Sequence, residues 1–193
     1  MALQLVTPPA VEPVELAEMK MHLRVEHSAE DALILVLIQA AREWCEEFTS
    51  RSFITRTWEL RLDAWPEERY IELPRPPLQG VTWVKYVDEN GVEHTLDAST
   101  YVVDAVSVPG RVVLVNNASW PSVALFPAGA VRVRYTAGYG SNPSDVPEMA
   151  RHAVRLLAAH WYENRENSSP AQLREIPMAA EMLLWPLRVK VVG

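Results

Sequence analysis

The stretch that decides the fold is residues 28–48, SAEDALILVLIQAAREWCEEF. Ser28 is a good helix N-cap, and Glu30 and Asp31 follow it in the first turn, where the helix dipole favours anions. Apolar residues then recur at helical spacing along one face, with more beside them. That face comprises Leu33, Leu37, Ala41, Trp44 and Phe48, flanked by Ile34, Ile38 and Cys45. The stretch therefore predicts a long helix packed against a core.

Leu35 and Val36 break the amphipathic pattern of this helix, because they fall toward the polar side that carries Gln39, Arg42, Glu43 and Glu46. A helix that is apolar nearly all round is usually covered all round. Either the chain's own β part covers these two residues or a neighbouring subunit does. The second alternative makes Leu35 and Val36 candidates for a subunit interface.

Helical and β signals occupy different parts of the chain. A shorter helix is predicted over about residues 14–23, after Pro13. There is no glycine before Gly80 and no proline from Val14 to Trp65, and six of the seven glycines lie between Gly80 and Gly140. This distribution predicts a helical N-terminal part followed by a turn-rich β part.

From residue 53 the apolar period changes to two, as in residues 58–62, 81–87 and 131–135. Asn90-Gly91 is a strong hairpin signal, because both residues accept positive φ. Several short strands with turns between them suggest a small antiparallel sheet, sandwich or barrel. A third helix is predicted over about residues 146–163, and a short one over about 178–185 ends at Pro186.

The predicted fold class is therefore α+β. A helical connector core, with two N-terminal helices plus one long and one short C-terminal helix, would comprise residues 1–50 and 141–193. An inserted small antiparallel β domain would comprise residues 51–140.

Composition and charge exclude several classes of function. With 18 basic and 25 acidic residues the net charge is −7, which disfavours nucleic-acid binding over the whole surface. No stretch approaches the roughly 18–20 apolar residues that span a bilayer, and residues 1–13 show no signal peptide. Residues 1–50 carry three basic and nine acidic residues, whereas residues 151–193 carry six and four. Head-to-tail contact between copies is therefore electrically possible.

No constellation of catalytic residues is visible. The five histidines form no close metal-ligand pattern, and there is no Gly-x-Ser-x-Gly or phosphate-binding glycine loop. Cys45 is the single cysteine, and its neighbours Glu46 and Glu47 disfavour a thiolate. We expect no enzyme and no catalytic, cofactor-binding or metal site. The seven Trp leave a carbohydrate-binding β module as an alternative, which predicts exposed Trp in a row.

Seven short motifs follow one another along the chain at residues 16–25 (LAEMKMHLRV), 30–34 (EDALI), 73–78 (LPRPPL), 109–112 (PGRV), 135–140 (YTAGYG), 160–166 (HWYENRE) and 184–189 (LWPLRV). Their order and spacing resemble the head–tail connector, or adaptor, family of tailed bacteriophages and prophages, in its longer β-containing form. Leu187 departs from the family pattern, which has an aromatic residue there.

The resemblance implies a structural protein of the virion neck, made and assembled in the bacterial host cytoplasm. Copies would form a ring of about twelve below the portal. Its partners would be the portal protein and a stopper or tail-completion protein, with no cofactor and no membrane. DNA would pass through the lumen without sequence-specific binding. A neck stopper or tail-completion protein is the closest alternative.

The resemblance also assigns the C-terminal segment to the portal. The portal-docking candidates are an apolar group before Pro186 and an alternating segment after it: Met182, Leu183, Leu184, Trp185, Leu187, Arg188, Val189 and Lys190. Pro186 would end the short helix and release an extended tail, which could add to a partner's sheet edge. The alternative is that this segment packs on the chain's own helices.

Overall fold

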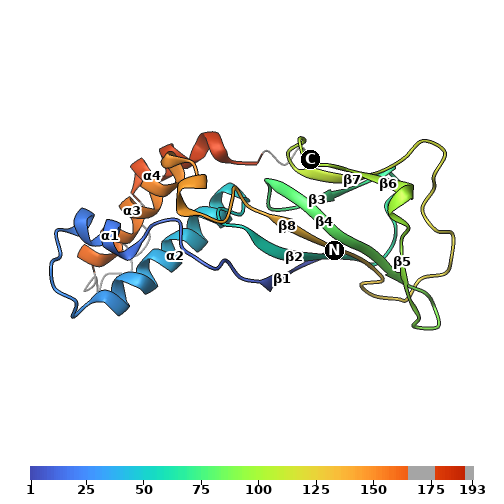
Figure 1. Ribbon diagram of the computed structural model, residues 1–193, viewed down its shortest axis with the longest axis horizontal. Helices are drawn as coiled ribbons and strands as arrows, with labels where there is room; N and C mark the ends of the chain where they lie inside the picture. The colour runs from blue at the N-terminus through green and yellow to red at the C-terminus, as the bar shows by residue number, and fades with distance from the viewer. Residues whose placement is uncertain (165–176, 190–193) are drawn as a thin grey trace. The chain divides into compact units, whose positions relative to one another are not determined.

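The computed structural model describes residues 1–164 and 177–189, and the chain divides into two compact units (Figure 1). The β unit comprises Met1–Pro9 and Thr55–Gly138, and the helical unit comprises Ala10–Ile54 and Tyr139–Gly193. Each unit has its own hydrophobic core.

The β unit contains two antiparallel sheets. The five-stranded sheet has the order β1-β2-β8-β4-β5 and the three-stranded sheet the order β3-β7-β6. The strands are β1 (Ala2–Thr7), β2 (Arg56–Leu62), β3 (Tyr70–Leu73), β4 (Leu78–Val87), β5 (Glu93–Thr95), β6 (Tyr101–Asp104), β7 (Gly110–Leu114) and β8 (Val131–Ala137).

The core of the β unit follows from period-two alternation. On the five-stranded sheet Leu60 lies opposite Val133, which lies opposite Val84, and all three are buried. They share a cluster with Ile71 and Val112 of the three-stranded sheet. The residues between the buried positions of β2, β8 and β4 therefore point to the other face of the five-stranded sheet.

The helical unit contains α1 (Leu16–Leu23), α2 (Asp31–Thr49), α3 (Glu148–Glu163) and α4 (Met178–Leu184). Their buried residues form one cluster that includes Ile38 and Leu157. Both α1 and α2 end without glycine. Arg24 (φ 57°) and Ser50 (φ 56°) adopt the left-handed conformation, and the following amides donate back to Lys20 O and Glu46 O. These are Schellman-type ends, which close each helix through its last carbonyls.

The structure shows that the predicted fold is wrong in its proportions. The described residues form four α-helices and eight strands in two antiparallel sheets, with strands dominating the N-terminal half. A helical core carrying a small inserted β domain does not match this arrangement. Residues 2–7 form β1, which pairs antiparallel with β2, so the chain begins in the β unit. As an edge strand exposed along most of its length, β1 lacks the buried face that makes alternation visible in a sequence.

Candidate subunit-contact and docking surfaces

Helix α2 presents an exposed face that changes character along its length. Val36 is 62% exposed and Leu35 is 46% exposed, whereas Ile34 and Ile38 beside them are buried. The described part of the chain therefore leaves both predicted interface residues open. We call the exposed face the α2 stripe: it comprises Ala32, Leu35, Val36, Gln39, Glu43 and Glu47. Its first half is apolar and its second half is acidic.

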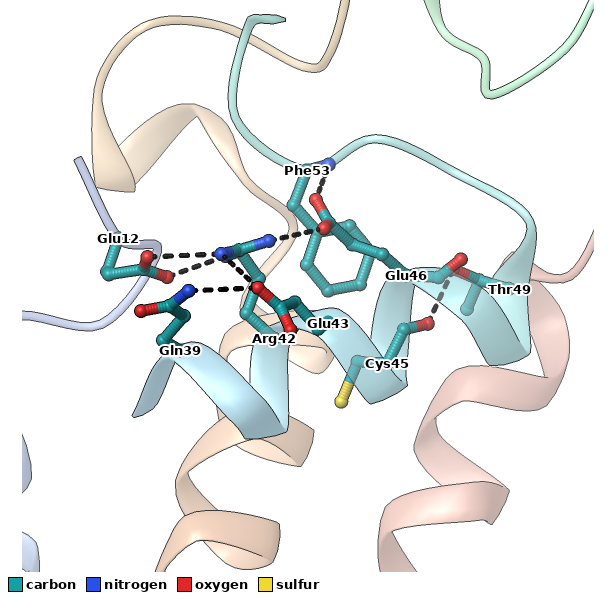
Figure 2. A network of polar contacts seen from close by, with 8 residues as sticks. All are labelled: Glu12, Gln39, Arg42, Glu43, Cys45, Glu46, Thr49 and Phe53. Carbon is teal, nitrogen blue, oxygen red and sulfur yellow. Dashed lines mark hydrogen bonds and ion pairs between the residues drawn. The ribbon is translucent and has the colours of Figure 1, made fainter. Parts of the chain in front are cut away.

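A buried polar network anchors α2 (Figure 2). The Arg42 side chain is only 4% exposed, and its Nε donates to Glu12 at 2.7 Å while a terminal nitrogen donates to Glu46 at 2.8 Å. The other Glu46 oxygen accepts the backbone amide of Phe53 at 2.7 Å. Arg42 and Glu46 thus tie the segment before α1, helix α2 and the chain after it into one rigid arrangement.

Charge inside this network is stabilised by its neighbours. Burial alone would lower the pKa of Arg42, but the hydrogen bond to Glu12 and the field of Glu46 outweigh burial and raise it. The Cys45 thiol lies on the buried side of the same helix, where burial, and then Glu46, raise its pKa to about 12. Cys45 is therefore a small core residue without thiolate character.

Sequence reasoning missed this network, because it assigned Arg42 and Glu46 to the polar side of the helix. Both are buried, whereas Leu33, assigned to the core face, is 36% exposed. The sequence did contain one indication of this network. Arg42 and Glu46 have opposite charges, lie four residues apart and directly follow the core residues Ala41 and Cys45. That spacing permits an ion pair but does not show the third partner, Glu12, which lies 30 residues earlier.

The portal-docking candidates fall into two groups. Met182 (69%) and Trp185 (64%) are exposed, while Leu184 is fully buried and Leu183 and Leu187 pack partly on the helical core. The Val189 amide donates to Thr49 O at 3.0 Å, and the Arg188 guanidinium lies over the rings of Phe48 and Trp185. Lys190 lies outside the described residues. The buried members hold this segment on the helical unit, and the exposed members are available for contact.

The Trp side chains do not form an exposed row in the part of the chain that the structure describes. Trp65 and Trp120 stack on each other with ring centroids 4.9 Å apart. Cations lie over the rings of Trp58 and Trp83. Of the seven Trp side chains, all of which are described, Trp185 is the only exposed one. The feature on which the carbohydrate-binding alternative depended is therefore missing.

Across residues 1–164 and 177–189, no group of three or more His, Cys, Asp or Glu side chains is placed to hold a metal ion. None of the helices described has the length and apolar character needed to cross a membrane.

An exposed apolar surface on a rigidly anchored helix is typical of a structural protein that assembles with other chains. The chain belongs to the head completion protein family, which it matches over residues 14–172. No curated protein matches the chain.

Solved structures of gene transfer agent particles contain chains similar to this one along its whole length. A chain in the neck of an empty gene transfer agent particle, computed with C6 symmetry, has a TM-score of 0.83 and 30% sequence identity. One in the virion of the native particle has a TM-score of 0.81 at 30% identity, and one in the native neck, computed with C12 symmetry, has 0.81 at 29%. Each match covers 100% of this chain and 98% of the other.

These findings confirm the predicted resemblance to head–tail connector proteins. They also confirm a structural role at the neck of a phage or phage-like particle. The head completion protein family consists of structural proteins of the particle.

Proposed function

We propose that the protein is a ring-forming adaptor without catalytic activity, placed between the portal and the rest of the neck. One observation supports a ring. The similar neck chains come from structures computed with C6 and C12 symmetry. In a cyclic assembly every copy uses two different patches, so the contact closes without isologous pairing. DNA passes through the lumen without sequence-specific binding, and a stopper or tail-completion protein follows below.

The exposure of Leu35 and Val36 is the observation that carries this proposal. Their helix is held by the Arg42 network, so the apolar half of the α2 stripe is presented in a fixed geometry. A preorganised surface loses little conformational freedom on binding. Leu35 and Val36 therefore belong to the subunit contact.

The experiment replaces both residues in Leu35→Glu/Val36→Glu. We expect a folded monomer that forms no ring with portal, measured by native mass and electron microscopy. The matched control is Met21→Glu/Val92→Glu, which introduces the same charge at two exposed apolar positions outside α2. If the first variant assembles on portals as the control does, the α2 stripe is not the subunit contact.

The same proposal assigns portal docking to the C-terminal segment. Met182 and Trp185 supply exposed apolar contact, and Arg188 and Lys190 supply charge for acidic groups of the portal. Leu184, Leu187 and Val189 hold the segment on the helical unit. The alternative, that the segment only packs on its own helices, predicts no role for the exposed members.

A double substitution separates these alternatives. Met182→Ser/Trp185→Ser removes exposed apolar surface and leaves the buried anchors in place. We expect normal folding and loss of attachment to portal-bearing heads, measured by co-sedimentation. Met149→Ser, at an exposed methionine of α3, serves as the control. Normal attachment of the double variant would remove Met182 and Trp185 from the docking surface.

A further inference from the structure

Three cations lie directly opposite one another on adjacent strands of the five-stranded sheet. Arg61 on β2 pairs in register with Arg132 on β8, which pairs with Lys85 on β4. Like charges directly opposite across a strand pair repel each other and destabilise the sheet. The repulsion within such a row lowers the stability of the free protein, and a bound anion would reduce that repulsion.

The neighbouring residues compensate the row only in part. Glu59 pairs with Arg61 at 2.8 Å and Arg134 at 2.6 Å, and Glu93 pairs with Lys85 at 2.5 Å and Arg132 at 3.6 Å. Four cations thus share two carboxylates. We call these cations, with Trp83 beside them, the basic sheet face. The β unit as a whole is acidic, with ten acidic and eight basic residues, so positive charge is concentrated on this face.

The basic sheet face is accessible and ordered. Its four cationic side chains are between 28% and 40% exposed. Lys85 and Arg134 both lie over the Trp83 ring, at 5.0 and 4.8 Å from its centroid. These cation–π contacts hold the two charged groups in place, so that an arriving anion meets a preformed surface.

We infer that the basic sheet face receives the acidic end of the α2 stripe, Glu43 and Glu47, from a neighbouring copy of this chain. The inference rests on the ring proposed above and names the second patch that a cyclic contact requires. Glu43 is 58% exposed, and its Oε1 accepts hydrogen bonds from Gln39 at 3.0 Å and from Arg42 at 3.4 Å (Figure 2). Glu47 is also exposed. Four helical residues rise about 6 Å. The adjacent strands that carry the cations lie about 5 Å apart, which is similar to that rise.

Carboxylates fit this face better than the phosphates of DNA. Glu59 and Glu93 lie among the cations and would repel a continuous polyanion. The net charge of −7 opposes long-range attraction of DNA as well. Two carboxylates on one helix face add only local negative charge, which the excess of cations can neutralise.

Charge reversal and charge exchange test the pairing. In Arg61→Glu/Arg132→Glu we expect ring formation on portal to weaken at least about tenfold, because like charges then meet across the contact. Adding Glu43→Lys/Glu47→Lys to the same chain should restore it. Arg24→Glu/Arg69→Glu, at two exposed arginines outside the face, makes the same change in net charge and should assemble normally.

A cysteine pair tests contact directly in assembled necks. Glu43→Cys/Arg132→Cys should give covalently linked multimers on mild oxidation, and each single substitution should give none. The native Cys45 does not interfere, because it is buried and its pKa is raised to about 12.

The outcomes separate this inference from the ring itself. If the wild-type chain forms no ring with portal, the proposed function fails. If it forms rings and the Arg61→Glu/Arg132→Glu variant does so equally well, the pairing is overturned and the ring stands. Loss of assembly without restoration by the exchanged charges, together with no cross-link, overturns Glu43 and Glu47 as the occupant. Salt-sensitive binding of a 30-base-pair duplex that this variant loses, with rings intact, would assign the face to DNA instead.

Discussion

The two units use charge in opposite ways. In the helical unit Arg42 is buried and is bonded to Glu12 and Glu46. In the β unit Arg61, Arg132 and Lys85 lie partly exposed in one row and share two carboxylates with Arg134. The buried charges of the helical unit fix its local geometry. The four cations of the β unit outnumber their two carboxylates, so this face can still attract an anion. A helical unit held by buried ion pairs and a sheet face that keeps a net positive charge suit a subunit that must first fold and then assemble.

The strongest way to break this comparison is to remove the centre of the buried network. Arg42→Ala removes the cation that bonds to both Glu12 and Glu46, and removing one partner of a buried ion pair costs about 3–5 kcal/mol. We expect the free energy of unfolding of the helical unit to fall by that amount in urea titrations. Arg69→Ala, at an exposed site of the β unit, should change it by less than about 0.5 kcal/mol. Equal effects of the two substitutions would contradict the structural role of the network.

Two neighbouring positions on α2 sharpen the distinction between core and contact surface. Ile38 is fully buried, so Ile38→Ala should cost about 2–5 kcal/mol of folding stability. Val36 is 62% exposed, so Val36→Ala should cost less than about 0.5 kcal/mol. Thermal and urea unfolding of the purified protein check both values. A large loss for Val36→Ala would place this residue in the core of the free chain.

The sequence predicted the strongly periodic elements well, because each has one buried face. The predicted helix over residues 28–48 lies almost wholly within α2, and the alternating stretches at 58–62, 81–87 and 131–135 lie within β2, β4 and β8. Edge strands such as β1 and β6 lack that contrast. The strands of the three-stranded sheet are only four or five residues long, which is too short for an alternating period to stand out in the sequence.

The surfaces were predictable only where one element contained the whole signal. Leu35 and Val36 stand out within a single helix, so the helical periodicity of the sequence was enough to identify them. The Arg42 network joins residues 30 positions apart, and the cation row depends on the register of three strands. Register in a sheet follows from tertiary pairing, which spacing along the chain does not reveal.

Strands β7 and β4 approach each other closely at Gly110, and a substitution there tests the packing of the two sheets. A Cβ added at Gly110 on β7 would lie 2.5 Å from Leu78 Cβ, an atom fixed directly to the backbone of β4. Because the leucine cannot simply rotate away, Gly110→Ala should destabilise the β unit by about 1–3 kcal/mol. Urea unfolding measures the loss. The companion variant Leu78→Ala/Gly110→Ala leaves the Cβ clash in place, so it should not recover the lost stability, and full recovery would show that only the outer leucine atoms were in the way.

The smallest expected effect has the opposite sign. Arg132 lies opposite both Arg61 and Lys85, so Arg132→Gln should relieve repulsion in the row while the amide can still bond to nearby polar groups. The variant gives up a long ion pair to Glu93, at 3.6 Å, which Lys85 continues to neutralise, and a long hydrogen bond from Nε to Gly129 O, at 3.3 Å. We expect the free protein to gain a few tenths of a kcal/mol at low salt, and to lose that gain near 1 M salt, where charges are screened within about 3 Å. Thermal unfolding at the two salt concentrations measures the difference. Arg69→Gln, which removes an exposed arginine outside the row, should show no such salt-dependent gain. A salt-independent loss in Arg132→Gln would mean that the row is already neutralised within the chain, and the contrast between the two units would then disappear.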